Sequence, residues 1–218
     1  METAGGVFRT RIGAAIQLTL VLIAIEGALW SRGVTQRYWF LAALAVIGLI
    51  VLISRPRAQD LGVGLQGIKQ TSWIIPLALV VCSAFVVASV MFGTFGPLYG
   101  NMPVSWHAIF YAIWALEQQF ILNAIFYRGF ENLFGNGNLA VVITAALFAL
   151  VHIPNPVLMP ATFLGGLLFV EAFRRWRNIY PLAIAHAIFG LTLAVTFPDH
   201  WIRHMRVGLG FLTFHARG

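Results

Sequence analysis

Charged residues and cysteine are both scarce in this chain. Aspartate, glutamate, lysine and arginine make up only 10% of its 218 residues, and Cys82 is the single cysteine. One cysteine excludes a disulfide within the chain and a zinc site made of several cysteine thiolates. The alternation of polar and apolar residues that is typical of membrane-barrel strands is also absent. The chain is therefore expected to be helical and to fold without a disulfide.

Apolar residues, by contrast, make up 60% of the chain, and the mean hydropathy is +0.84. These values lie outside the range of soluble globular proteins and predict a polytopic membrane protein. The net charge is +7, and the arginines lie in short breaks between apolar runs. That placement is typical of membrane topology and of contact with anionic lipid. We therefore expect the lipid bilayer as a partner, and no nucleic acid.

Seven apolar segments predict an all-α transmembrane bundle of about seven spans, folded as a single membrane domain over residues 1–218. The segments are residues 12–30, 38–54, 73–92, 104–130, 139–152, 161–173 and 179–197. The fifth and sixth are short, because 14 helical residues extend only about 21 Å against about 30 Å of hydrocarbon. They are joined by IPNPVLMPA, a stretch with three prolines and no charge. Non-helical backbone at membrane depth is tolerated where it lines a cavity, so we expect a cavity here.

The arginines and the one lysine also predict the orientation of the chain. If the N-terminus is cytoplasmic, nine basic residues fall on the inner side and five on the outer side, as the positive-inside rule favours. The inner set is Arg9, Arg11, Arg55, Arg57, Lys69, Arg128, Arg174, Arg175 and Arg177. The outer set is Arg32, Arg37, Arg203, Arg206 and Arg217. We expect a multi-pass protein of the inner (cytoplasmic) membrane, with residues 12–30 as an uncleaved first span and residues 198–218 as a basic, aromatic interfacial tail.

Polar residues inside the apolar segments are the candidate functional groups. His152 ends the fifth segment, and His186 lies about 12 Å into the seventh, so the two imidazoles are expected to meet near mid-depth. Ionisable groups at membrane depth are costly and are functional-site hypotheses by default. The fourth segment carries Glu117, Asn123 and Arg128, and helical spacing places Glu117 on one face with Ala124 and Arg128. The alternative is that these polar groups only hydrogen-bond to neighbouring spans and fix their packing.

Two local ion pairs are expected from helical spacing at the inner ends of the spans. Glu171 lies three and four residues before Arg174 and Arg175, which is the spacing of neighbours on a helix surface. Glu131 is expected to pair with Arg128 in the same way. Glu26, in the first span, has no partner that the sequence identifies.

The ordered motifs Arg128-Gly129, Phe148-xxx-His152 and His186 resemble the membrane-embedded CAAX prenyl protease and bacteriocin-processing family, also called CPBP or Abi. The resemblance covers roughly residues 100–195, which makes residues 1–100 lead-in spans and residues 101–197 the family-like core. The family pattern is EExxxR, FxxxH and HxxxN on successive helices. The resemblance implies an intramembrane endopeptidase in which a glutamate activates water and two histidines assist it.

The chain departs from that pattern at three positions. The two glutamates fall at Asn123 and Ala124, and the asparagine after the last histidine falls at Gly190. The sequence is therefore that of a divergent member without the glutamate pair. Two replacements for the missing base stay open: Glu117, if the fourth helix is displaced or kinked, or a histidine with Asn123 and Gln119 as amide donors.

The first hypothesis is an integral-membrane endopeptidase with His152, His186, Glu117, Asn123 and Arg128 in its site. Its substrate is expected to be a peptide or a membrane-protein tail that enters from the cytoplasmic side. The alternative is a non-catalytic membrane protein on the same fold that binds a lipid, a peptide or a partner helix. A transporter is the weakest option, since no inverted repeat is evident. No cofactor is expected; a zinc ion, if present, would bind His152 and His186, but a third protein ligand is missing from the sequence pattern.

Overall fold

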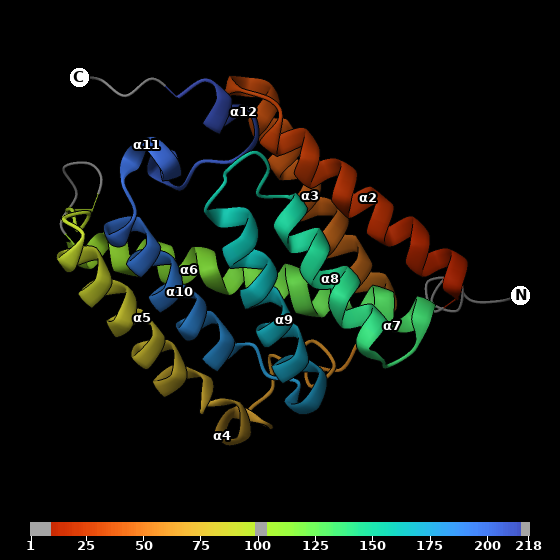
Figure 1. Cartoon of the computed structure of the whole chain (residues 1–218). Helices are drawn as coiled ribbons and strands as arrows, with labels where there is room; N and C mark the ends of the chain where they lie inside the picture. Colours follow the sequence, from red (N-terminus) through yellow and green to blue (C-terminus); the bar gives the residue numbers. More distant parts are fainter. Residues whose placement is uncertain (1–9, 99–103, 215–218) are drawn as a thin grey trace, which may run out of the picture.

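The computed structural model describes residues 10–98 and 104–214 and consists of helices joined by short loops, without a strand in those residues (Figure 1). The predicted all-α membrane bundle is thereby confirmed as a fold class. Arg9, His215 and Arg217, which the topology and tail predictions used, lie outside the described residues.

Four helical stretches are long and apolar enough to cross a membrane: Arg11–Leu29 (α2), Gly33–Ser54 (α3), Ile68–Met91 and Ser105–Phe134. The third combines α4 (Ile68–Thr71) with α5 (Ile74–Met91), and the fourth combines α6 (Val104–Gln119), η1 (Phe120–Tyr127) and α7 (Arg128–Phe134). Two further apolar helices are shorter, namely α8 (Asn138–Leu150) and α10 (Tyr180–Thr196). With α9 (Leu158–Trp176), every predicted apolar segment coincides with a helix.

The sixth segment is longer than predicted. It was expected over residues 161–173, but α9 begins at Leu158 and has 19 residues. The sequence interpretation treated Pro160 as a helix breaker. Pro160 lies in the first turn of α9, where the backbone N–H groups have no intrahelical partner, so a proline is tolerated there.

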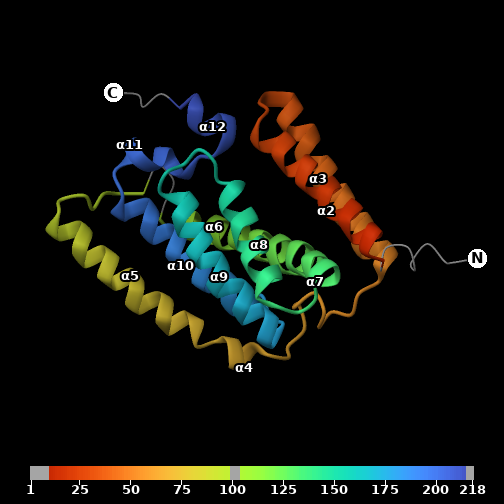
Figure 2. The same cartoon turned by 45° about the vertical axis from the view of Figure 1, so that its right-hand side comes forward.

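The helices form three groups across the molecule (Figures 1 and 2). The α2–α3 hairpin makes one flank, α5 with α10 makes the other, and α8 and α9 pack against each other between them. The stretch α6–η1–α7 crosses the bundle and contacts α10 at one end and α2 at the other. The larger apolar core joins α5, η1, α8, α9 and α10, and a smaller one packs the hairpin onto η1.

Two buried asparagines, one at each end of the bundle, hydrogen-bond to the backbone of neighbouring loops. Asn155, in the proline-rich connector, donates from Nδ2 to the carbonyl oxygens of Ile202 (2.9 Å) and Arg206 (3.0 Å). These bonds dock the tail segment with α11 (Asp199–Ile202), η2 (Arg203–Met205) and α12 (Gly208–Leu212) onto the connector. At the other end, Asn178 donates to the carbonyl oxygens of Gly64 (2.8 Å) and Gln66 (2.9 Å). The described part of the tail is therefore an ordered cover on the bundle.

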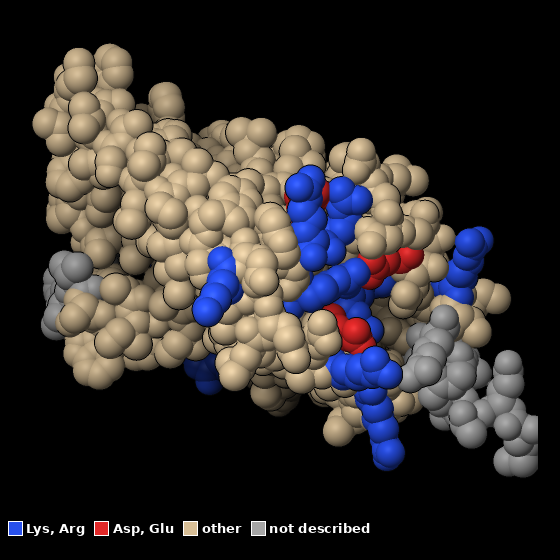
Figure 3. Space-filling model, turned by 90° about the horizontal axis from the view of Figure 1, so that it is seen from below, with Lys and Arg blue, Asp and Glu red and all other residues tan. Residues whose placement is uncertain are grey.

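Basic residues gather at one end of the molecule, which we call the basic face (Figure 3). This end carries the start of α2, the end of α3, α4, the start of α7 and the end of α9 (Figure 1). The basic face holds Arg11, Arg55, Arg57, Lys69, Arg128, Arg174, Arg175 and Arg177. The opposite end holds Arg32, Arg37, Arg203 and Arg206. The described basic residues thus divide between the ends as the sequence predicted, whichever side of the membrane each end faces.

Candidate functional site

A cavity of about 630 Å³ lies between the α2–α3 hairpin and the helices α6, η1 and α8. We call it the histidine cavity, because His152 is on its wall. Most of its lining is apolar; the polar lining residues are Gln36, Arg37, Glu117, Gln118 and His152. Val207 of the tail also contributes to the wall. Because Gln36 and Arg37 begin α3 and Val207 precedes α12, the cavity lies at the end away from the basic face.

His152 follows the last turn of α8 and is held in one orientation by its own helix. Its Nδ1 lies 2.6 Å from the carbonyl oxygen of Phe148. A carbonyl oxygen can only accept, so Nδ1 carries the proton and donates it. In the neutral imidazole Nε2 then keeps its lone pair. His152 therefore brings a hydrogen-bond acceptor and potential base to the cavity wall.

A buried amide network holds His186 and places its proton on the other ring nitrogen from that of His152. The Asn123 Nδ2 group donates to the backbone oxygen of Gln119 (3.0 Å) and to its Oε1 (2.8 Å). Because the backbone oxygen only accepts, these bonds fix the orientation of both amides. The Gln119 Nε2 group then donates to Nδ1 of His186 at 3.1 Å. In the neutral ring the His186 proton consequently lies on Nε2.

The two imidazoles meet at the ring of Phe148. Its centroid is 5.0 Å from that of His152 and 5.8 Å from that of His186, both nearly perpendicular. Phe169 and Tyr111 pack on His186, at 5.7 Å and 6.4 Å. His186 is 7% exposed and is not among the residues that line the histidine cavity. The structure thus brings both histidines to one aromatic ring, but only His152 to the cavity wall.

The π-helix η1 changes the register between Glu117 and Arg128. Its bonds run five residues back, as from the Arg128 N–H to the carbonyl of Asn123. Such segments are rare and have more residues per turn than an α-helix, so the side chains after it are rotated. Glu117 lines the histidine cavity, whereas Ala124 and Arg128 line a different one. All three residues line cavities that the α2–α3 hairpin closes, but Glu117 does not share its cavity with Ala124 and Arg128.

Arg128 lies in a second cavity of about 460 Å³, which we call the arginine cavity. It is lined by the first turns of α2, the end of α3, the connector after it and the start of α7. Its charged lining residues are Arg55, Arg57, Asp60 and Arg128. The apolar contacts of the hairpin with η1, through Leu18, Val21, Ile47, Ile125 and Phe126, lie between the two cavities. Arg128 is thus not brought together with the histidines.

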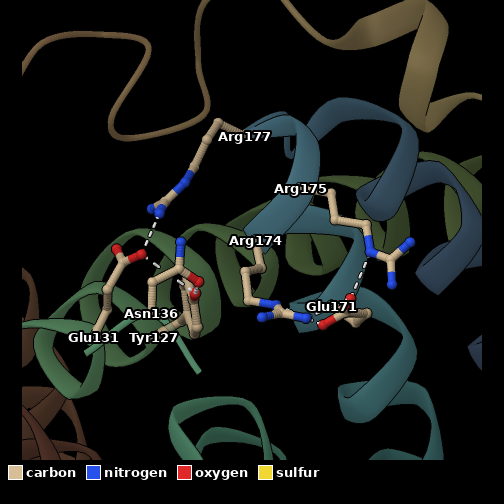
Figure 4. Close-up of polar contacts among 7 residues, drawn as sticks. All are labelled: Tyr127, Glu131, Asn136, Glu171, Arg174, Arg175 and Arg177. Atoms are coloured by element: carbon tan, nitrogen blue, oxygen red, sulfur yellow. Dashed lines mark hydrogen bonds and ion pairs between the residues drawn. The ribbon is translucent and has the colours of Figure 1, made fainter. Parts of the chain in front are cut away.

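Glu131 also has a different partner from the one predicted. It forms an ion pair with Arg177, from the α9–α10 turn, rather than with Arg128 (Figure 4). The Tyr127 hydroxyl donates to Glu131 at 3.4 Å, and Arg177 also lies over the Tyr127 ring. The expectation failed because spacing within one helix says nothing of a side chain that arrives from another loop. The predicted pairs of Glu171 with Arg174 and Arg175 are confirmed (Figure 4).

Some contacts around the site were missed from the sequence. Gly190 stands where the family pattern has asparagine, and a methyl group on it would lie 1.9 Å from the Tyr111 hydroxyl. The tyrosine hydroxyl therefore fills the space that a side chain at position 190 would need. No local signal points to Tyr111, since it lies on another helix. Glu26, for which the sequence identified no partner, accepts a hydrogen bond from the Trp30 indole at 2.8 Å.

The described residues do not fit a zinc site. They contain no group of three or more His, Cys, Asp or Glu side chains that could hold a metal ion. Zinc sites in proteins normally use at least three protein ligands, and the histidine pair lacks a third. In addition, the Nδ1 lone pair of His186 accepts from Gln119, so in the tautomers of this structure only Nε2 of His152 offers a lone pair.

The apolar helices identify the chain as an integral membrane protein of the helical-bundle class. Residues 100–192 match the family model described as type II CAAX prenyl endopeptidase Rce1-like. The resemblance to the CAAX-processing family is thereby confirmed, and this segment carries all five of the predicted site residues. No curated protein and no solved structure gives a significant match to the chain.

Proposed function

We propose that the protein is an intramembrane endopeptidase that hydrolyses a peptide bond in the histidine cavity. The observation that supports this most directly is His152, whose Nε2 keeps a lone pair on the wall of a largely apolar cavity. A basic nitrogen in such a place can accept a proton from an attacking water. The family match over residues 100–192 supports this reaction class.

In this proposal His152 is the general base and Glu117 is its charge partner. When water attacks the peptide carbonyl, its proton moves to Nε2 of His152 and creates an imidazolium. A positive charge in an apolar cavity is costly without an opposite charge. Glu117 lies on the same wall and supplies that charge. The amide of Gln118 and the guanidinium of Arg37 bring N–H groups to this wall, which can stabilise the carbonyl oxyanion.

His186 and Asn123 act as positioning residues in this scheme. Neither lines the cavity, and both are tied to Gln119, next to the cavity residues Glu117 and Gln118. The network fixes the end of α6 at the point where η1 begins. Arg128 has no part in the reaction, because it lies in the arginine cavity.

The test is cleavage of a quenched fluorescent peptide that carries a prenylated CAAX tail, with purified protein in detergent. General acid–base catalysis contributes about 10²–10⁴-fold, so His152→Ala is expected to lose that much. Glu117→Gln is expected to lose less, about tenfold, because the base remains. His200→Ala, on α11 and outside both cavities, is the matched control. A larger loss in Glu117→Gln than in His152→Ala would make Glu117 the base instead.

The second candidate is a non-catalytic protein that binds a lipid, a peptide or a partner helix in the same cavity. It is favoured by the absence of the glutamate pair at Asn123 and Ala124 and by the mostly apolar lining. It predicts that the peptide binds without being cleaved. Quenching of Trp114, which lines the cavity, would report binding. Binding that is unchanged in His152→Ala, with no cleavage by the wild type, supports this candidate.

For orientation we propose a multi-pass protein of the cytoplasmic membrane, with its N-terminus and basic face inside, as the positive-inside rule favours. The histidine cavity then opens in the outer half of the membrane. This differs from the expected entry of substrate from the cytoplasmic side, because the cavity and the basic face lie at opposite ends. In a Cys82→Ser background, a thiol reagent that does not cross membranes is expected to label Arg32→Cys from outside and to leave Gln59→Cys unlabelled. The opposite labelling would contradict this orientation and support entry of the substrate from the cytoplasmic side.

A further inference from the structure

The arginine cavity has the features of an anion site that the proposed protease reaction does not use. Its volume is about 460 Å³, and its wall carries the guanidinium groups of Arg55, Arg57 and Arg128 against the single carboxylate of Asp60. Polar backbone and side chains from Gln17, Ser54 and Asn132 complete the wall. The cavity therefore has a net positive charge.

The three guanidinium groups lack protein partners. None of them takes part in a hydrogen bond or an ion pair within residues 10–98 and 104–214. The possible acids are otherwise engaged: Asp60 accepts from the Arg57 backbone N–H at 3.3 Å, and Glu131 is bound to Arg177. Asp60 acts on Arg128 only through the longer-range electrostatic field.

Arg128 makes this imbalance costly. It is partly buried on the helix that crosses the bundle, next to Gly129, whose missing side chain lets α2 approach closely. A methyl group on Gly129 would lie 2.5 Å from Leu18. A partly buried guanidinium between apolar helices needs an opposite charge. The carboxylates among residues 10–98 and 104–214 supply too little, which leaves room for a bound anion.

The connector after α3 is shaped to bring two more arginines to the same place. Arg55 ends α3 in the left-handed conformation (φ 43°, ψ 55°), and its N–H bonds to the carbonyl of Val51. This conformation is unfavourable for a residue with a Cβ, so packing around it must enforce it. The turn, followed by Pro56, leaves Arg55 and Arg57 on the wall of one cavity.

We propose that the arginine cavity binds a phosphate group, with Arg128 as its inner contact and Arg55 and Arg57 as its outer contacts. Arginine forms paired N–H···O bonds with phosphate oxygens, and the charge excess matches such an anion. The cavity lies at the end of the spans on the basic face, where a lipid headgroup would also lie. The phosphate can come from an anionic phospholipid or from free phosphate, and the experiment separates these sources.

The experiment measures thermal unfolding of the full chain in dodecyl maltoside, a detergent without phosphate. Phosphatidylglycerol is added in one arm and inorganic phosphate in another, with sodium chloride at equal ionic strength as the reference. A ligand at about 100 times its Kd is expected to raise the Tm by about 5 °C for a protein of this size. A rise with both additives supports the site with either source, and a rise with phosphatidylglycerol alone supports it with a lipid source.

Variants locate the effect. Arg128→Gln and the double variant Arg55→Gln/Arg57→Gln are each expected to weaken the apparent affinity at least tenfold. Lys69→Gln removes a positive charge from the same face but outside the cavity, and its response is expected to stay within twofold of the wild type. If Arg128→Gln fails to fold, the apparent affinity of the double variant alone tests the site. No rise over chloride, or an equal loss in Lys69→Gln, would overturn the proposal.

Discussion

The two cavities lie at opposite ends of the same hairpin and differ in almost every physical respect. The histidine cavity is larger and mostly apolar, whereas the arginine cavity is smaller and charged. Both are closed by α2 and α3 on one side and by the stretch α6–η1–α7 on the other. The π-helix lies between them and sends Ile121 and Leu122 to the first and Ala124 and Ile125 to the second. The same helical stretch thus lines two environments, one on each side of the contact between η1 and the hairpin.

The largest expected effect is on the histidine cavity alone. His152→Ala should lower turnover about 10²–10⁴-fold, and adding Glu117→Gln should lower it little further, since residues that act as a unit are not additive. The phosphate-induced rise in Tm should be the same as in the wild type. Initial rates and unfolding curves on the same preparations measure both.

Independent losses in the double variant, multiplying the two single effects, would contradict the pairing of His152 with Glu117. Loss of the phosphate response in His152→Ala would show that the two cavities are not separate.

Variants of Asn155 and Asn178 separate the contributions of the two ends of the bundle. Asn155→Ala and Asn178→Ala each break two hydrogen bonds to backbone carbonyls and should each cost about 1–3 kcal/mol in the free energy of unfolding. Only Asn155 holds the tail that carries Val207 of the histidine cavity. Because small displacements in a site reduce catalysis strongly, kcat/KM should fall about tenfold in Asn155→Ala only.

The measurement is made at a temperature where both variants are fully folded. An equal fall in kcat/KM for the two asparagine variants would mean that activity follows general stability and not the cover at one end.

Gln119 and Gln118 are neighbours, but only the replacement of Gln119 is expected to destabilise the fold. Gln119→Leu leaves Nδ1 of His186 and the Asn123 amide without their partner in a buried network, at a cost of about 1–3 kcal/mol. Gln118 has a buried Oε1 with no partner among the described residues, so Gln118→Leu should change stability by less than about 0.5 kcal/mol. Unfolding in detergent measures both, and equal destabilisation would contradict the amide network.

The two sets of ion pairs on the basic face are expected to differ in how much they stabilise the fold. Glu131→Gln breaks a pair that joins α7 to the α9–α10 turn and is mostly buried, and we expect a loss of about 1–2 kcal/mol. Glu171→Gln breaks pairs on the surface of one helix and should cost less than about 1 kcal/mol. Unfolding at low and high salt compares them; a greater loss in Glu171→Gln would reverse the ranking.

Local features of the structure could be predicted from the sequence, whereas contacts between distant segments could not. The helices followed from long apolar runs, and the pairs of Glu171 from spacing within one turn, because both are local. The partners of Glu131 and Glu26 could not be predicted in this way. The partner of Glu131 comes from a distant turn. That of Glu26 is an indole, which spacing rules for charged residues do not consider. Pro160 misled the start of α9, because a proline breaks a helix in its interior but not in its first turn. His152 and His186 stood out since ionisable groups are rare in apolar segments.

The sequence by itself determined that this chain is a helical membrane protein with a basic end, with a family-like core over residues 100–192 and two histidines worth testing. Hydrophobicity and charge are additive along a chain, so they can be summed without coordinates. The tertiary structure decided which polar groups share a space: Glu117 with His152, and Arg128 with Arg55. That division depends on where the α2–α3 hairpin packs against the α6–η1–α7 stretch, and no local pattern of the sequence specifies that contact.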